Sequence, residues 1–226
     1  MSPVAIVGDV HGDFNALTKM LALLEGAERT VVFVGDYVNG GGASAAVLEE
    51  LSRRKQSQAE RWRFIAGNHD LALLDYVRGV GSFSALAAMG GVATLASYLP
   101  EVKGDLRTAF VSAFPARHQW FLETLAPCFE EEDLLVSHVG FCPDQPQERT
   151  FGALARSGDP RVFLSAGPRN LIVCGHYLQP SRRPFCSEHL ICLDTGCGIA
   201  GGPLTAVLLP EKEFLTVPPQ YCHKET

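Results

Sequence analysis

The chain has 226 residues, of which 46% are hydrophobic and 19% are charged, so it can bury a core and is not disordered throughout. Its net charge of -6, from 19 basic and 25 acidic residues, excludes a nucleic-acid binder that neutralises phosphates broadly. No apolar run approaches the roughly 20 residues of a membrane span, and the first residues lack the basic region of a secretory signal. We therefore expect a soluble, cytoplasmic protein with no membrane partner, and the oligomeric state stays open.

Five short apolar runs, rich in β-branched residues, are predicted to be buried strands. They begin at Val4, Val31, Phe64, Leu134 and Leu171. Two segments with helical spacing, Phe14 to Leu24 and Ala43 to Leu51, separate the first three runs. This alternation predicts parallel strands joined by right-handed crossovers.

The second half of the chain changes pattern twice. From about 71 to 127, apolar residues recur at helical intervals, with breaks at Gly90-Gly91, Pro100 and Pro115. We interpret this stretch as a helical insertion or flank within a single domain covering 1–226. After it, three short runs are predicted to be antiparallel closing strands: Leu190 to Leu193, Thr205 to Leu209 and Phe214 to Val217. The pattern predicts an α/β fold with a two-layered sheet core and helices outside.

Polar side chains follow each of the five predicted strands, at the point where the strand ends. The set comprises Asp9, His11, Asp36, Asn68, His69, His138 and His176. If His138 or His176 is considered alone, the simpler interpretation is a hydrogen-bonded histidine in the core. The repetition at five strand ends overrides that interpretation, because ligand sites in such folds form beyond the carboxyl ends of the strands.

The combination of carboxylate, amide and imidazole groups suits borderline divalent metals. Manganese is our first expectation, with iron or zinc as alternatives. The set is too large for one tetrahedral ion, whereas two ions sharing a carboxylate would use it fully. Two-metal sites clamp the attacking and leaving oxygens of a phosphoryl group, so the pattern indicates hydrolysis of phosphate esters.

Six blocks of this sequence resemble, in order, those of the calcineurin-like metallophosphoesterases. They are GDVHG at 8–12, GDYVNGG at 35–41, GNHD at 67–70, HVG at 138–140, GH at 175–176 and LDTGCGIAGGPLTA at 193–206. The branch that contains serine/threonine protein phosphatases and bacterial symmetrical diadenosine tetraphosphatases is the most similar. The resemblance spans nearly the whole chain and implies a four-layer α/β/β/α sandwich of mixed sheets.

The resemblance also implies roles for individual residues. Asp9 and His11 would hold the first metal ion, Asp36 would bridge both ions, and the second ion would bind Asn68, His138 and His176. A hydroxide between the ions would attack phosphorus directly, so no phosphoenzyme is expected. His69 would be the catalytic imidazole that protonates the leaving oxygen.

Two departures from the protein phosphatases concern the segment after Asp36. Where those enzymes have an aspartate that orients the catalytic imidazole, this chain has Asn39, and their phosphate-binding arginine is replaced by Gly40. Asn39 retains the capacity to hydrogen-bond His69 without stabilising its charged form. Among the arginines near His138 and His176, Arg161 is the one that we expect to bind phosphate in place of the missing side chain.

The sequence is compatible with three functions. The first is hydrolysis of phosphate monoesters, with a phosphoprotein or nucleotide substrate. The second is symmetrical cleavage of dinucleoside tetraphosphates, which the GNHD block and the missing aspartate–arginine pair favour. The third is a metal-binding interaction module with weak catalysis, which Asn39 and Gly40 favour and the complete ligand set opposes.

Overall fold

The computed structural model describes residues 2–26, 28–99, 101 and 104–219. Its first elements alternate strand and helix, as the sequence predicts. They are β1 (Val4–Val7), α1 (Phe14–Leu24), β2 (Thr30–Phe33), α2 (Ser44–Ser57) and β3 (Trp62–Phe64). The Asp13 side chain caps α1 by accepting a hydrogen bond from the Ala16 N–H at 2.9 Å. Helix α2 continues beyond the predicted end at Leu51, to Ser57.

The first sheet has the strand order β10-β9-β1-β2-β3. Its closing strands are β9 (Leu204–Leu209) and β10 (Glu213–Val217). Strands β1, β2 and β3 are parallel, whereas β9 pairs antiparallel with both β1 and β10. These directions confirm the predicted parallel opening and the predicted antiparallel ending of the chain.

The second sheet has the order β4-β5-β6-β8-β7. Its strands are β4 (Cys128–Glu130), β5 (Leu134–Ser137), β6 (Leu171–Cys174), β7 (Phe185–Cys186) and β8 (Leu190–Cys192). The prediction for the run at Leu190 was wrong in part, because β8 pairs parallel with β6 and antiparallel only with β7. All three residues of β8 are buried, as is usual for a parallel strand covered on both faces.

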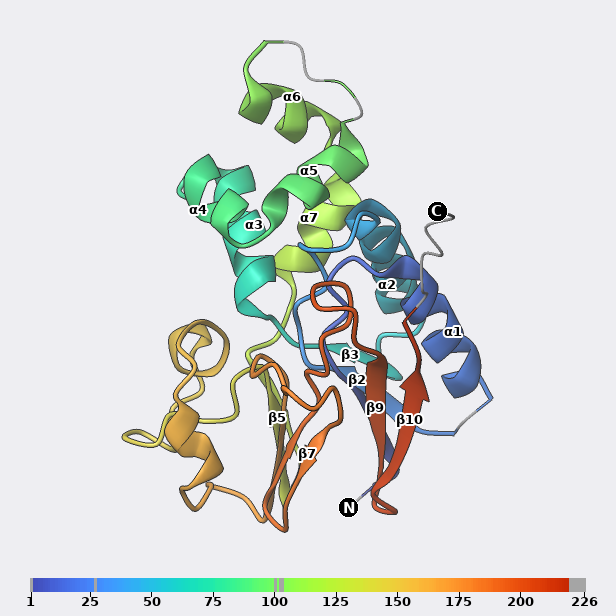
Figure 1. Cartoon of the computed structure of the whole chain (residues 1–226), viewed down its shortest axis with the longest axis vertical. Coiled ribbons are helices and arrows are strands. Elements are labelled where there is room, and N and C mark those ends of the chain that lie inside the picture. The colour runs from blue at the N-terminus through green and yellow to red at the C-terminus, as the bar shows by residue number, and fades with distance from the viewer. Residues whose placement is uncertain (1, 27, 100, 102–103, 220–226) are drawn as a thin grey trace.

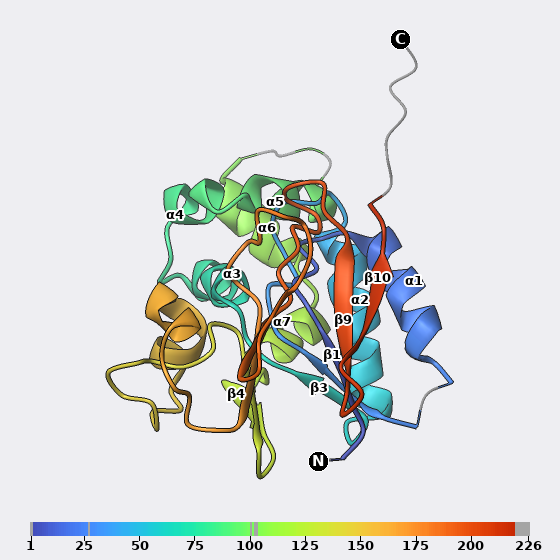
Figure 2. The ribbon, with the colours of Figure 1, turned by 60° about the horizontal axis from the view of Figure 1, so that its bottom comes forward.

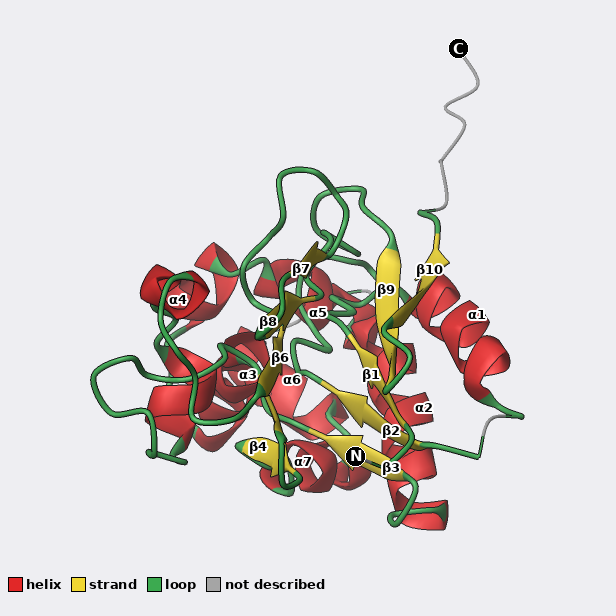
Figure 3. Cartoon of the chain, turned by 90° about the horizontal axis from the view of Figure 1, so that it is seen from below, coloured by secondary structure: helices red, strands yellow, loops and turns green. Residues whose placement is uncertain are grey.

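The two sheets pack face to face through one apolar layer (Figure 3). Alternate residues supply it, such as Ile6 of β1 and Val173 of β6. Helices α1 and α2 cover the outer face of the first sheet. The outer face of the second sheet packs against the 139–170 segment, which includes a π-helical turn, η1 (Gly152–Arg156), and a 3-10 turn, η2 (Pro160–Phe163). The fold is thus the expected four-layer α/β sandwich, with a thin fourth layer.

Among the described residues of the stretch predicted to be helical, five helices occupy most of its length. They are α3 (Asn68–Arg78), α4 (Phe83–Ala88), α5 (Gly91–Tyr98), α6 (Leu106–Ala113) and α7 (Ala116–Glu123). Two predicted breaks are confirmed, since Gly90 precedes α5 and Pro115 precedes α7, whereas Pro100 lies outside the described residues. Figures 1 and 2 place α4, α5 and α6 together at one end of the molecule, and α5 and α7 pack against α2.

None of the helices in the described parts of the chain combines the length and apolar composition needed to cross a bilayer.

Candidate metal centre

The predicted polar side chains converge at one edge of the two sheets. Because β1, β2 and β3 are parallel, their carboxyl ends deliver Asp9, Asp36 and Asn68 to the same edge. The parallel pair β5 and β6 brings His138 and His176 to this edge from the second sheet. Side chains from both sheets therefore form one site, as the strand-end pattern predicts.

The first of two clusters consists of His11, Asp36 and His69. Their potential ligand atoms lie within 4.8 Å of one another. Nε2 of His11 is 3.7 Å from Asp36 Oδ2, and Nε2 of His69 is 3.8 Å from the same oxygen. The two imidazoles meet edge to face, with ring centroids 4.8 Å apart. Three potential ligand atoms thus face a common volume, and one of them belongs to His69, the residue predicted to be catalytic.

The second cluster consists of Asp36, His138 and His176, again within 4.8 Å. Asp36 Oδ2 is 3.3 Å from Nε2 of His138. The Asn68 amide oxygen lies between the two imidazoles, 2.9 Å from His138 Nε2 and 3.0 Å from His176 Nδ1. Asp36 therefore belongs to both clusters, and the two together are consistent with a dinuclear metal centre.

Asp9 lies beside both clusters and is almost fully buried, at 2% exposure. Its Oδ2 accepts a hydrogen bond from the His176 N–H at 3.0 Å and is 4.0 Å from His11 Nε2. Its Oδ1 is buried and has no hydrogen-bond partner among the described residues. An unpaired buried carboxylate oxygen is costly unless a cation meets it, so this atom fits a metal ligand.

Backbone carbonyls orient two of the imidazoles. Nδ1 of His11 is 3.2 Å from the Val38 carbonyl, and Nδ1 of His138 is 3.0 Å from the Val34 carbonyl. An N–H at Nδ1 that donates to these carbonyls leaves the Nε2 lone pair facing the cluster. Metal-binding histidines have this arrangement, in which the second nitrogen fixes the tautomer.

The site gathers negative charge in a dry environment. Burial and the neighbouring Asp194 raise the pKa of Asp9 well above its ordinary value. Burial would also raise the pKa of Asp36, but the charge and hydrogen bond of His138 bring it below its usual range. Burial would lower the pKa of His138, whereas Asp36 raises it to about 10. The charged form of Asp9 is therefore costly in the absence of cations, and bound cations would relieve that cost.

Two buried carboxylates at this edge were missed as site residues by the sequence analysis. Asp194 is 2% exposed and accepts the Gly196 N–H at 3.0 Å, and burial raises its pKa. It follows the end of β8, so the strand-end rule applied to that run would have found it.

Asp70 is the other missed carboxylate, and it fixes the loop that bears Asp36. Its two oxygens accept the N–H groups of Asp36, Tyr37 and Gly67 at 2.7 to 2.9 Å. Burial and the charge of Asp36 nevertheless raise the pKa of Asp70 to about 7. A carboxylate that binds both strand-end loops keeps Asp36 and Asn68 at a constant separation.

Four site residues have backbone angles in the left-handed region. The φ values are 46° for His11, 53° for Asp36, 70° for Asn39 and 64° for His176. Residues other than glycine pay about 1–3 kcal/mol for such conformations and retain them where the surrounding structure imposes them. The sharp turns aim these side chains back across the strand ends toward one another.

Asn39 lies against the predicted catalytic imidazole. Its Nδ2 is 3.0 Å from His69 Nδ1, and Asn39 itself is fully buried. The neighbouring Gly40 has a φ of 91°, and a Cβ at this position would overlap Ile199. The left-handed backbone and the Ile199 side chain therefore disfavour a larger residue at position 40.

Arg161, the predicted phosphate ligand, forms ion pairs with two carboxylates. Its guanidinium donates to Asp144 and Asp159, with shortest distances of 2.6 Å. These bonds direct the side chain to its own loop, and a phosphate would have to replace one of them. The role of Arg161 stays a prediction.

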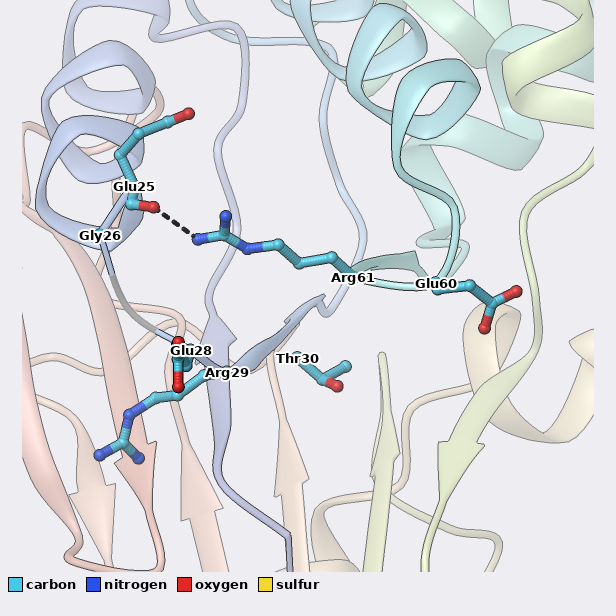
Figure 4. A pocket seen from close by; sticks show the side chains of 7 residues that line it. All are labelled: Glu25, Gly26, Glu28, Arg29, Thr30, Glu60 and Arg61. Atoms are coloured by element: carbon cyan, nitrogen blue, oxygen red, sulfur yellow. Dashed lines mark hydrogen bonds between the residues drawn. The ribbon is translucent and has the colours of Figure 1, made fainter.

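A separate cavity of about 470 Å³ lies at the opposite ends of the strands (Figure 4). It is lined by Glu25, Gly26, Glu28, Arg29, Thr30, Glu60 and Arg61. Arg61 donates to the Glu25 carbonyl at 2.9 Å, and Arg29 pairs with Glu211 at 2.9 Å. The cavity contains none of the residues that the strand-end pattern predicts.

Residues 2–181 match the family described as calcineurin-like phosphoesterase. The chain belongs to this family, and it is a metal-dependent phosphoesterase.

Two bacterial relatives have the name bis(5'-nucleosyl)-tetraphosphatase PrpE, asymmetrical. That of Halalkalibacterium halodurans is 27% identical over 239 residues, covering 94% of this chain and 92% of the relative. That of Bacillus velezensis is 26% identical over 240 residues, covering 94% and 91%. These relatives share almost the full length of the chain.

A solved structure confirms the fold. A candidate diadenosine tetraphosphatase superposes with a TM-score of 0.66 at 24% identity, covering 97% of this chain and 95% of the other. A serine/threonine phosphatase from Saccharomyces cerevisiae superposes with a TM-score of 0.60 at 15% identity, covering 97% and 80%.

Gly67→Ala is expected to lower metal affinity and kcat by about tenfold or more. A Cβ at Gly67 would overlap both Oδ1 and the backbone nitrogen of Asp36, so the shared carboxylate must move, and misplacement of about 1 Å can cost 10²-fold in rate. Gly42→Ala is the matched control, because a Cβ there meets no atom within 4 Å. Metal titration and steady-state kinetics check the pair, and equal behaviour of both variants would contradict the expectation.

Proposed function

We propose that the protein hydrolyses dinucleoside polyphosphates at a dinuclear metal centre. The shared Asp36 Oδ2, which faces both clusters, is the observation that supports the chemistry. The names of relatives that match over more than nine-tenths of both chains support the substrate class.

The proposed metal ligands are those that the sequence resemblance implies. Asp9 and His11 bind one ion, Asp36 binds both, and the second ion binds Asn68, His138 and His176. Manganese is the proposed metal, with iron or zinc as alternatives. The bound ions would supply charge neutralisation at phosphorus and activation of water near neutral pH.

Three other residues are proposed to contact the substrate or to hold the site residues in place. His69 is proposed to contact the leaving oxygen, and at 19% its side chain is more exposed than those of His11, Asp36 and His138. Asn39 holds His69 through the bond at Nδ1. Asp70 keeps the loops of Asp36 and Gly67 together, so that the ligands stay in place during turnover.

The test is product analysis with manganese-loaded protein and diadenosine tetraphosphate. Asymmetrical cleavage yields ATP and AMP, whereas symmetrical cleavage yields two molecules of ADP. Either result supports the proposal, and the products decide between the relatives' named activity and the symmetrical cleavage favoured by the sequence blocks. Elemental mass spectrometry of the same preparation gives the number and identity of the metals.

A phosphopeptide assay in parallel tests the monoester alternative. Release of phosphate from phosphopeptides without cleavage of the dinucleotide would replace the proposal by a protein-phosphatase-like function. Metal-replete protein that turns over no phosphate ester would overturn both and leave the interaction module.

A further inference from the structure

The arginines of the 139–170 segment all form ion pairs, which fix where their guanidinium groups point. The pairs are Arg149 and Arg169 with Glu130, Arg156 with Asp75, and Arg161 with Asp144 and Asp159. Arg182 differs from these arginines. It is partly buried, and its guanidinium has no hydrogen-bond or ion-pair partner among the described residues. The charge of Arg182 therefore lacks the counterion that the other four arginines have.

Arg182 lies in the loop that follows His176 and packs on the loop that follows Asp194. Its Nη1 is buried there, 2.6 Å from the position that a Cβ on Gly196 would take. Backbone hydrogen bonds join the same two loops, because the Gln179 N–H donates to the Asp194 carbonyl at 2.9 Å. The Arg182 N–H in turn donates to the Gln179 carbonyl at 3.0 Å. The guanidinium is thus fixed between two loops that both begin at the carboxyl ends of strands, at the site.

The loop on which Arg182 packs also touches the proposed metal centre. A Cβ on Gly198 would overlap the His11 carbonyl oxygen. The next residue, Ile199, lies against Gly40, which replaces the phosphate-binding arginine of the protein phosphatases. Arg182 is therefore at the rim of the metal centre, and it approaches from a different loop than an arginine at position 40 would.

An unpaired guanidinium in a partly buried position favours the binding of an anion. The arginine side chain is always charged in proteins, and the removal of a charge from water without a counterion is costly. Nη1 of Arg182 is packed against the neighbouring loop, whereas Nε and Nη2 form no bond with a described residue. The edge that bears Nε and Nη2 has two parallel N–H groups, which match two oxygens of one phosphate group.

We propose that Arg182 binds the substrate phosphate next to the one held at the metal centre, and that it thereby selects polyphosphate chains over phosphate monoesters. The inference rests on the proposed function and adds a specificity-determining residue to it. Both metal-binding clusters are formed by other side chains, and Arg182 lies beyond Asp194 at their rim. A second phosphate of a chain that extends from the clusters would meet the guanidinium there, whereas a monoester has no such group.

The first experiment compares wild type and Arg182→Ala on diadenosine tetraphosphate and on p-nitrophenyl phosphate, which has a single phosphate. We expect R182A to raise the KM for the dinucleotide about tenfold or more, because it loses charge-assisted hydrogen bonds to a phosphate. The kinetics on p-nitrophenyl phosphate should stay close to those of wild type, which also shows that the variant is folded. Arg182→Lys should give an intermediate KM, since lysine keeps the charge without the planar pair of donors.

Arg183→Ala is the matched control, because it removes the same charge from the next position, where the side chain is exposed. This variant should retain the wild-type KM for both substrates. Equal losses of R182A on the two substrates would indicate damage to the metal centre and would overturn the inference. An Arg161→Ala variant with a larger rise in KM for the dinucleotide than R182A would also overturn it, since phosphate binding would then belong to Arg161.

A binding measurement tests Arg182 without turnover. Calorimetric titration of manganese-loaded protein with ADP and with AMP compares ligands that have two phosphates and one. We expect R182A to weaken the binding of ADP about tenfold and to leave the binding of AMP almost unchanged, and an unchanged affinity for ADP would refute the role. A wild type that cleaves no dinucleotide overturns the proposed function, whereas the difference between ADP and AMP still decides whether Arg182 binds a second phosphate.

Discussion

Asp36→Asn is expected to lower kcat/KM for a dinucleoside tetraphosphate by on the order of 10³-fold or more, which corresponds to several kcal/mol of lost stabilisation. The Asp36 Oδ2 atom faces both clusters, at 3.3 Å from His138 Nε2 and 3.7 Å from His11 Nε2. An amide of the same shape removes the charge from both clusters at once. Steady-state kinetics with excess manganese, together with the metal content, measure the effect.

Two further variants are needed to interpret the kinetics of D36N. Asp133→Asn makes the same chemical change near the start of β5, at the opposite strand ends, and should retain wild-type kinetics. His138→Ala removes a ligand of the second cluster only, so it should lose activity while retaining one ion per chain. Full activity of D36N with two bound metals would refute the proposed centre.

Removal of the metals by a chelator is expected to abolish hydrolysis and to lower Tm by roughly 5–10 °C. A ligand present at 100 times its Kd stabilises the folded state by about 2.7 kcal/mol, and each kcal/mol moves Tm by about 2–4 °C for a chain of this size. The physical source is the group of buried carboxylates, Asp9, Asp36, Asp70 and Asp194, which repel one another when no cation is bound.

Calorimetry with and without manganese measures this shift. The D36N variant serves as the control, because it lacks the shared ligand and should respond to manganese much less than wild type. An identical Tm for wild type in chelator and in excess manganese would contradict a metal centre built on these carboxylates.

The residues at the strand ends could be predicted to lie together because parallel strands end at the same edge of a sheet. An apolar run that stops at a carboxylate or imidazole gives the position of that group at the sheet edge, so Asp9, Asp36 and His138 come together although they lie far apart in the sequence. The same logic gives the parallel direction of β1, β2 and β3.

Other features had no local signal. Thr94 lies in a helix, 55 positions from Asn39, and only the packing of α5 beside the Asn39 turn brings their side chains together. For Arg161, the sequence places a positive charge near the site, but Asp144 and Asp159 decide where its guanidinium points. The direction of β8 depends on the strands that it pairs with, β6 and β7, and the sequence of β8 alone does not reveal these partners.

The left-handed backbone at His11, Asp36, Asn39 and His176 places the side chains of the site but lowers the stability of the folded protein. Each turn costs free energy of folding that a glycine would recover, and each bears a side chain that glycine would delete. The cations that three of these side chains are proposed to bind would offset that cost, so heat should unfold the metal-free protein from this edge first.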